Sequence, residues 1–119
     1  MEGIQFNIKK FASDLNIDFE EAWNLYSEYL REVKIQITQA SAYLQEKDWE
    51  NLKKVIHNIK GLSSNYRIFN IFTEAEALDK ELKNNVEVNA RLYVDRLFVM
   101  VKNAENAIKN FFRENGIQI

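Results

Sequence analysis

Residues 19–44 read FEEAWNLYSEYLREVKIQITQASAYL, and this stretch decides the fold class. Its apolar side chains recur in alternating steps of four and three residues, which is the spacing of one face of an α-helix. Asp18 precedes the stretch as the expected N-cap, and Glu21 stands where a capping box needs an acid. The pattern therefore predicts one long helix that ends near residues 46–48. The apolar positions are Phe19, Trp23, Tyr26, Leu30, Val33, Ile37, Ala40 and Leu44.

Three more apolar stripes follow along the chain, each on one helical face. The first is expected to begin after Asp48, its N-cap. The second is expected to start at Asn70 and to end at Asn84 and Asn85, which tolerate the left-handed conformation past a helix end. The third is expected to stop at Gly116. The stripes consist of Leu52, Ile56, Ile59, Ser63 and Tyr66; of Ile71, Ala75, Leu78 and Leu82; and of Ala90, Val94, Leu97, Val101, Ala104, Ile108 and Phe111.

A short helix is expected ahead of these four, because Ile4, Ile8 and Phe11 repeat at helical spacing. Short connections make neighbouring helices antiparallel, and four one-sided helices bury their stripes most simply against one another. The predicted fold is all-α: an antiparallel up-down-up-down four-helix bundle with a short N-terminal helix capping one end. All four stripes can be buried within one chain, so we expect a monomer with one domain over residues 1–119.

Composition excludes several functional classes. Sixteen Lys and Arg against 18 Asp and Glu give a net charge of −2, without the basic excess of a general nucleic-acid binder. Cysteine is absent and His57 is the one histidine, so thiolate and multi-histidine metal sites are excluded. No apolar run approaches the ~20 residues that span a bilayer, and the N-terminus lacks signal-peptide features. The protein is expected in the cytoplasm, with neither nucleic acid nor a membrane as its partner.

The polar face of the helix that follows Asp48 holds the candidate site. His57 points nearly opposite to the apolar stripe, and Lys53, Lys60, Gly61 and Ser64 lie on its side of the helix. A glycine inside a helix costs about 1 kcal/mol relative to alanine, so Gly61 favours clearance for the approach of another molecule. A tolerated surface glycine is the alternative.

An exposed imidazole among lysines suits phosphoryl transfer. Imidazole is partly neutral and nucleophilic near pH 7, and neighbouring cations offset the charge of a phosphoryl group. The alternatives at this point are an idle surface histidine and ordinary solvated lysines.

The segment His57-x-x-Lys60-Gly61-x-x-Ser64-Asn65 resembles the signature of the histidine-containing phosphotransfer (HPt) domains of two-component phosphorelays, usually H-x-[LI]-K-G-x-[SA]-x-x-[LV]-G. The resemblance covers roughly residues 4–83. Its further matches are Asp48-Trp49 followed by Leu52, like the family's D-W-x-x-L run; Phe11-Ala12-Ser13-Asp14-Leu15 followed by Asp18, like the start of its first long helix; and Ala75, Leu78 and Asp79, where the family has A-x-x-L-[EQ]. The last helix fits the bundle without a motif.

The resemblance implies a role for each site residue. His57 would be phosphorylated at Nε2, Lys60 would steady the phosphoryl charge, and Gly61 would let a receiver domain close in. Asp79 would orient the imidazole; the alternative is a surface acid near a helix end. Ser64 would bond near the phosphate or only solvate the helix. The expected partner-binding residues are Lys53, Lys54, Leu62 as an exposed apolar contact, Arg67 and Lys83.

The resemblance also implies the partners. The chain would accept a phosphoryl group from the aspartyl phosphate of a receiver domain, such as that of a hybrid sensor kinase, and pass it to a response regulator. It would be a phosphohistidine carrier without a kinase activity of its own. No metal or cofactor is expected on this chain, because the receiver supplies the Mg²⁺. Arg67 replaces the family's glycine ten residues after the histidine, which leaves the local docking surface open.

Two other functions are considered. A helical interaction module that has lost the relay would be expected to lack the histidine or the lysine, and both are present. A bundle that binds haem or another ligand through His57 would need the imidazole inside the bundle, where the stripe does not place it.

Overall fold

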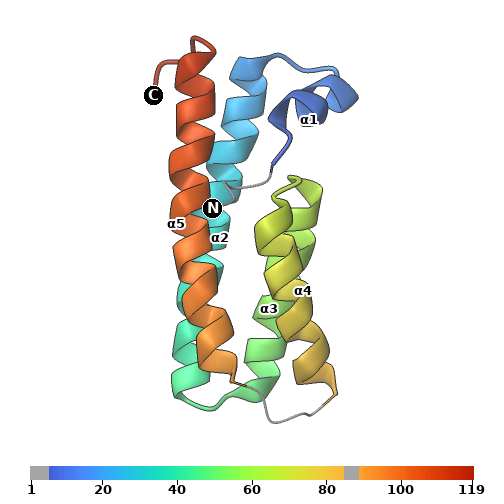
Figure 1. Cartoon of the computed structure of the whole chain (residues 1–119), viewed down its shortest axis with the longest axis vertical. Coiled ribbons are helices and arrows are strands. Elements are labelled where there is room, and N and C mark those ends of the chain that lie inside the picture. Colours follow the sequence, from blue (N-terminus) through green and yellow to red (C-terminus); the bar gives the residue numbers. More distant parts are fainter. Residues whose placement is uncertain (1–5, 85–88) are drawn as a thin grey trace.

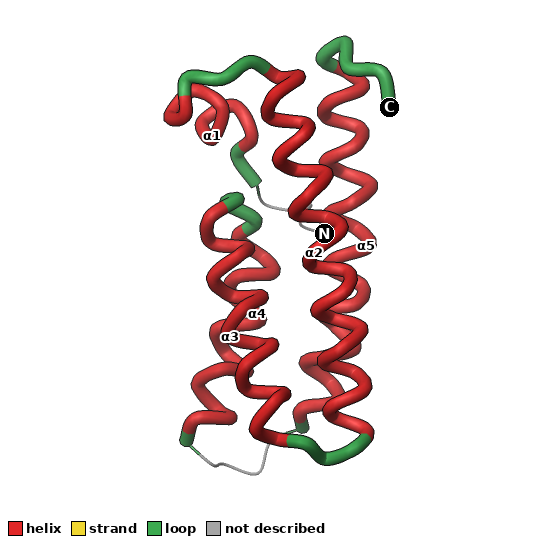
Figure 2. Tube along the Cα trace, turned by 180° about the vertical axis from the view of Figure 1, so that it is seen from behind, coloured by secondary structure: helices red, strands yellow, loops and turns green. Residues whose placement is uncertain are grey.

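The computed structural model describes residues 6–84 and 89–119, and within them the chain is all-helical, with five helices and no strand. The four longer helices lie side by side along the long axis of the molecule (Figures 1 and 2). Helix α2 packs on α3 and α5, and α4 packs on the same two helices, so the four form a closed ring of contacts. The helices are α1 (Ile8–Leu15), α2 (Phe19–Gln45), α3 (Trp49–Asn65), α4 (Phe69–Lys83) and α5 (Ala90–Glu114).

The predicted helix starts depend on local caps, and two of them are confirmed. The Asp18 carboxylate accepts from the Glu21 N–H at 2.8 Å, and the Asp18 N–H donates to the Glu21 carboxylate at 3.4 Å, which completes the capping box. Asp48 caps α3 by accepting from the Asn51 N–H at 3.2 Å. Helix α4 begins at Phe69, one residue before the predicted start, and has no side-chain cap.

The helix ends show one error of prediction. Gly116 follows the end of α5 with a φ of +87°, as expected of a glycine stop. Asn84 is not left-handed: its φ is −84°, because its N–H still bonds to the Lys80 carbonyl at 3.2 Å and closes the last turn of α4. Asn85, predicted at the end of this helix, and Ile4, predicted in the short N-terminal helix, lie outside the described residues.

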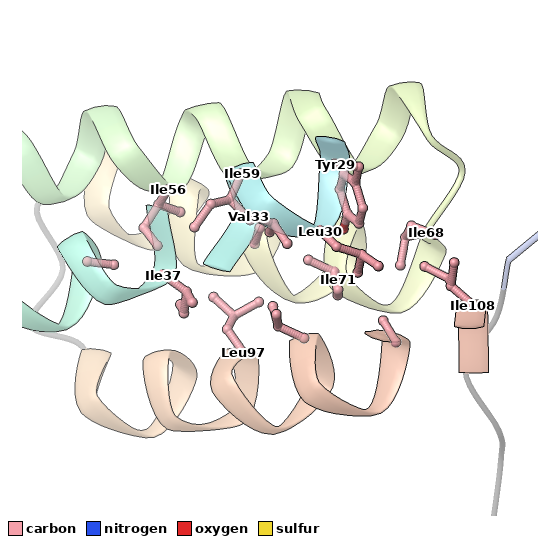
Figure 3. Packing of buried hydrophobic residues seen from close by; sticks show 14 of the residues in the cluster. Tyr29, Leu30, Val33, Ile37, Ile56, Ile59, Ile68, Ile71, Leu97 and Ile108 are labelled. Carbon is pink, nitrogen blue, oxygen red and sulfur yellow. The ribbon is translucent and has the colours of Figure 1, made fainter. Parts of the chain in front are cut away.

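The core is built from the predicted stripes, and its aliphatic part is drawn in Figure 3. Five stripe positions are only half-buried: Phe19, Trp23, Leu44, Tyr66 and Phe111. At the end of the last stripe Phe112 is fully buried in place of Phe111. A stripe spaced at 3.5 residues drifts by about 20° per heptad against an ideal helix. Over the three heptads that follow Ala90, this drift turns Phe112 toward the core in place of Phe111. No helix in the described ranges is long and apolar enough to cross a membrane.

Helix α1 lies near the α3–α4 turn and packs on α2 (Figure 2). Its Phe11 ring sits 4.9 Å from the ring of Tyr26 and stacks at 5.3 Å on the ring of Tyr66. These rings belong to a connected set that we call the aromatic cluster. Its members are Phe6, Phe11, Phe19, Trp23, Tyr26, Tyr29, Tyr66, Phe111 and Phe112.

Candidate functional site

His57 lies on the outer face of α3 with 59% of its side chain exposed. Its position follows from the helical period, because the neighbours Ile56 and Ile59 are fully buried in the core (Figure 3). The solvent-facing histidine that the sequence predicted is therefore confirmed. A bundle that binds a ligand through His57 would need the imidazole in its interior, and the imidazole does not face the interior.

Asp79 meets His57 from α4, and its side chain is only 1% exposed. The alternative that Asp79 is a surface acid is wrong, because the packing of α4 on α3 covers it. Its Oδ2 lies 3.7 Å from Nδ1 of His57. That distance brings the ring nitrogen and the carboxylate face to face, but it is too long for a hydrogen bond.

Two lysines form ion pairs with the same carboxylate oxygen of Asp79. Lys83 Nζ lies 3.1 Å and Lys60 Nζ 3.3 Å from Oδ2 of Asp79. The other oxygen, Oδ1, is buried and has no hydrogen-bond partner among the described residues. Burial acts most strongly on the pKa of this carboxyl and would raise it, but the hydrogen bonds and charges of Lys83 and Lys60 together lower the pKa below its usual value. Asp79 is therefore an ionised, buried group at neutral pH.

Gly61 lies one turn from His57 on the exposed face. A Cβ added there would meet nothing within 4 Å among the described residues, so no internal contact requires a glycine. The surface at Gly61 is open, which fits both the clearance interpretation and a tolerated surface glycine.

The other predicted residues gather less closely around His57. Lys54 and Ser64 are exposed, and Lys53 is half-buried. Leu62 is half-buried and packs against the core, so it is not the exposed apolar contact that the sequence predicted. The reason is that Leu62 flanks the apolar stripe of α3. The structure thus joins His57, Lys60, Asp79 and Lys83 in one cluster, while the remaining predicted residues lie elsewhere on α3 or, for Arg67, beyond its end.

Arg67 is engaged elsewhere. Its guanidinium pairs with Asp14 of α1 at 2.8 Å and lies 5.9 Å from the centre of the Phe11 ring. The backbone of Arg67 is left-handed, with a φ of +61°. The Asp14 contact could not be predicted, because the two residues are far apart in the chain and neither stands in a local pattern with the other.

No metal site is evident in residues 6–84 and 89–119, where no three His, Cys, Asp or Glu side chains gather to hold an ion. A shallow surface hollow on α5, lined by Asp95, Arg96, Val99 and Met100, includes none of the residues of the His57 cluster.

Comparison with known proteins returns no relative: no protein-family model, curated protein or solved structure matches the chain. The interpretation of the His57 cluster therefore rests on its residues and their geometry.

Proposed function

We propose that this chain is a phosphorelay intermediate of the HPt type, which receives a phosphoryl group on His57 from a receiver domain and delivers it to another. The observation that carries the proposal is the His57 cluster itself. An exposed imidazole turns Nδ1 toward a buried carboxylate, two lysines stand beside it, and the helix surface next to it is open at Gly61.

The chemistry needs little more than these groups. Nε2 of His57 attacks the phosphorus of an aspartyl phosphate, the P–O bond of that acyl phosphate breaks, and the donor carboxylate leaves. The proton on Nδ1 stays on the ring, and the Asp79 carboxylate supports the positive charge that develops there. Lys60 and Lys83 offset the phosphoryl charge. The reverse sequence with a second receiver aspartate completes the relay, and the Mg²⁺ belongs to the receivers.

The backbone at Arg67 supports the HPt resemblance despite the changed residue. The family pattern has glycine at this position, and glycine is the residue that adopts positive φ without strain. Arg67 adopts a φ of +61°. The chain thus keeps the conformation for which the glycine is suited, and Arg67 gains a partner in Asp14.

The proposal includes the finer architecture. We place the four long helices in antiparallel up-down-up-down order, with α1 across one end, in a single monomeric domain that acts in the cytoplasm. The short connections between α2 and α3 and between α3 and α4 support this order. Lys53 and Lys54 would then meet the acidic pocket of a receiver and speed the encounter.

The test is phosphoryl transfer from several phosphorylated receiver domains, with His57→Gln as the matched variant. The wild type should acquire acid-labile label and return it to a second receiver. His57→Gln should acquire none, while its helical content and melting temperature stay unchanged, because the side chain is exposed. Label on His57→Gln would move the site elsewhere, and a folded wild type that no donor labels would argue for an interaction module.

A further inference from the structure

One oxygen of Asp79 faces three nitrogen atoms, and their distances to it are unequal. Both lysine ammonium groups lie within 3.3 Å of Oδ2, whereas Nδ1 of His57 remains at 3.7 Å. Oδ1 is buried and has no hydrogen-bond partner in the described part of the chain. In the unphosphorylated protein the carboxylate therefore pairs with the two lysines and makes no hydrogen bond to the imidazole.

We propose that Asp79 holds Lys60 and Lys83 only until His57 is phosphorylated; the lysines then move to the phosphoryl oxygens, and Asp79 accepts a hydrogen bond from Nδ1–H of His57. The inference rests on the proposed function. It assigns Asp79 as a positioning residue that exchanges its partners during the relay.

The charges favour this exchange. Two ammonium groups and one carboxylate sum to a net charge of +1 in the lysine–aspartate part of the unphosphorylated cluster. A phosphoryl group adds about −1.5 to −2 charges and three strong acceptor oxygens. Each ammonium has three donors, so it can turn to a second acceptor that carries more charge than the carboxylate.

The side chains differ in how readily they can move. Lys83 is 57% exposed and Lys60 24% exposed, so Lys83 is the freer of the two to reach a group on the ring. Asp79 cannot move outward, because it is 1% exposed on the inner side of α4. A buried carboxylate that loses its cations needs another donor, since an unpaired buried charge is costly. Nδ1–H is the nearest ring donor, and two carboxylate oxygens can receive it.

The exchange has a functional consequence for the relay. Asp79 competes with the phosphoryl group for the same two lysines. The return of the lysines to Asp79 accompanies departure of the phosphoryl group, which keeps the phosphohistidine from becoming a stable end product.

The first experiment loads His57 without a receiver, using phosphoramidate. Its P–N bond breaks as the P–N bond to Nε2 forms, and ammonia is released. The phosphoryl group of the full chain is then titrated by ³¹P NMR in the wild type, in Lys83→Gln and in Lys80→Gln. Lys80 is the matched control, because it is exposed on the same helix and makes no ion pair with the described residues.

A close cation favours the dianion, so its removal in Lys83→Gln should raise the pKa of the second ionisation of the phosphoryl group. We expect a rise of about half a unit or more, which is roughly a threefold change in proton affinity. Lys80→Gln should leave it near the wild-type value. An equal titration in the wild type and in Lys83→Gln would overturn the exchange, since it would leave Lys83 on Asp79.

The second measurement follows the ring of His57 by ¹H–¹⁵N NMR. A protected Nδ1–H signal should appear on phosphorylation of the wild type and be lost in Asp79→Asn. A protected signal already present before phosphorylation, or one unchanged in Asp79→Asn, would contradict the inference. The Lys83→Gln titration keeps the test decisive if Asp79→Asn does not fold.

The two proposals fail separately. Label from phosphoramidate with the exchange absent would remove only this inference. Exchange signals without any transfer from a receiver would remove the proposed function. A folded wild type whose His57 cannot be labelled would remove both.

Discussion

The aromatic cluster and the His57 cluster differ in how completely their polar atoms are hydrogen-bonded. In the aromatic cluster the Tyr26 hydroxyl donates to the Tyr66 carbonyl at 2.8 Å, and the Tyr29 hydroxyl lies 2.9 Å from Oγ of Ser63. Burial raises the pKa of both tyrosines, so they remain uncharged. In the His57 cluster three nitrogen atoms face one oxygen, and the ring nitrogen at 3.7 Å is too far from it for a hydrogen bond. The two buried hydroxyls have partners and stabilise one end of the fold, whereas the incompletely paired groups of the His57 cluster remain available for chemistry.

The largest expected effect separates the two regions by stability. Tyr26→Ala removes a fully buried ring that contacts Phe11, Tyr66 and Phe112, and should lower the free energy of unfolding by about 3–5 kcal/mol. Chemical denaturation measures the loss. Tyr26→Phe is the control that keeps the ring, and it should lose only about 1 kcal/mol because the Tyr66 carbonyl loses its donor. Equal losses of unfolding free energy in the two variants would show that packing of the Tyr26 ring does not stabilise the fold.

Asp79→Asn should have the next largest effect, with a pH dependence that Tyr26 variants lack. The pKa of Asp79 is lowered in the folded state, so its stabilisation is present above the ordinary aspartate pKa of about 3.9 and disappears as the pH falls through the lower folded value. At pH 7 the variant should be less stable by about 1–3 kcal/mol. Unfolding curves from pH 7 down to pH 2 should show this difference shrink below pH 4. A difference that is constant with pH would show that the charge of Asp79 contributes nothing.

Gly61 offers a test in which stability and transfer move in opposite directions. Gly61→Ala should stabilise the protein by up to about 1 kcal/mol, because the added Cβ meets no atom and alanine favours the helix. Gly61→Gln should keep the helix but slow phosphoryl transfer from a receiver by placing a long side chain beside the imidazole. Melting curves of the two variants measure the change in stability, and their phosphoryl-transfer rates measure the effect of the longer side chain. An unchanged transfer rate in Gly61→Gln would remove the clearance interpretation.

The smallest effect is expected where α1 meets the α3–α4 turn. Asp14→Asn weakens the exposed pair with Lys10 and breaks the pair with Arg67, whose side chains are both about a third exposed, and should cost less than about 1 kcal/mol. Arg67→Gly loses the same pair but relieves the left-handed residue, so its stability should fall by less than that of Asp14→Asn or even rise. Thermal melts of the two single variants compare them. A larger loss in Arg67→Gly would mean that contacts of the guanidinium outweigh the backbone strain.

The sequence predicted what depends on local periodicity and missed what depends on packing between helices. The caps at Asp18 and Asp48 and the buried faces of the helices are local features, and the structure has them. Placing Phe111 in the core was wrong, because the drift of a regular spacing accumulates along α5. The depth of Asp79 could not be predicted, since it depends on how closely α4 packs on α3. The roles of these residues in phosphoryl transfer stay predictions.

The left-handed residues that follow the first three helices have a consequence for how such a chain can vary. These residues are Asn16, Lys47 and Arg67, and none is glycine. A glycine would relieve strain of about 1–2 kcal/mol at such a position but would also widen the conformational freedom of the unfolded chain. The two effects partly cancel, so substitutions between glycine and larger residues at these turns are nearly neutral. Stability at these turns therefore depends mainly on the path of the backbone and only weakly on which residue follows it.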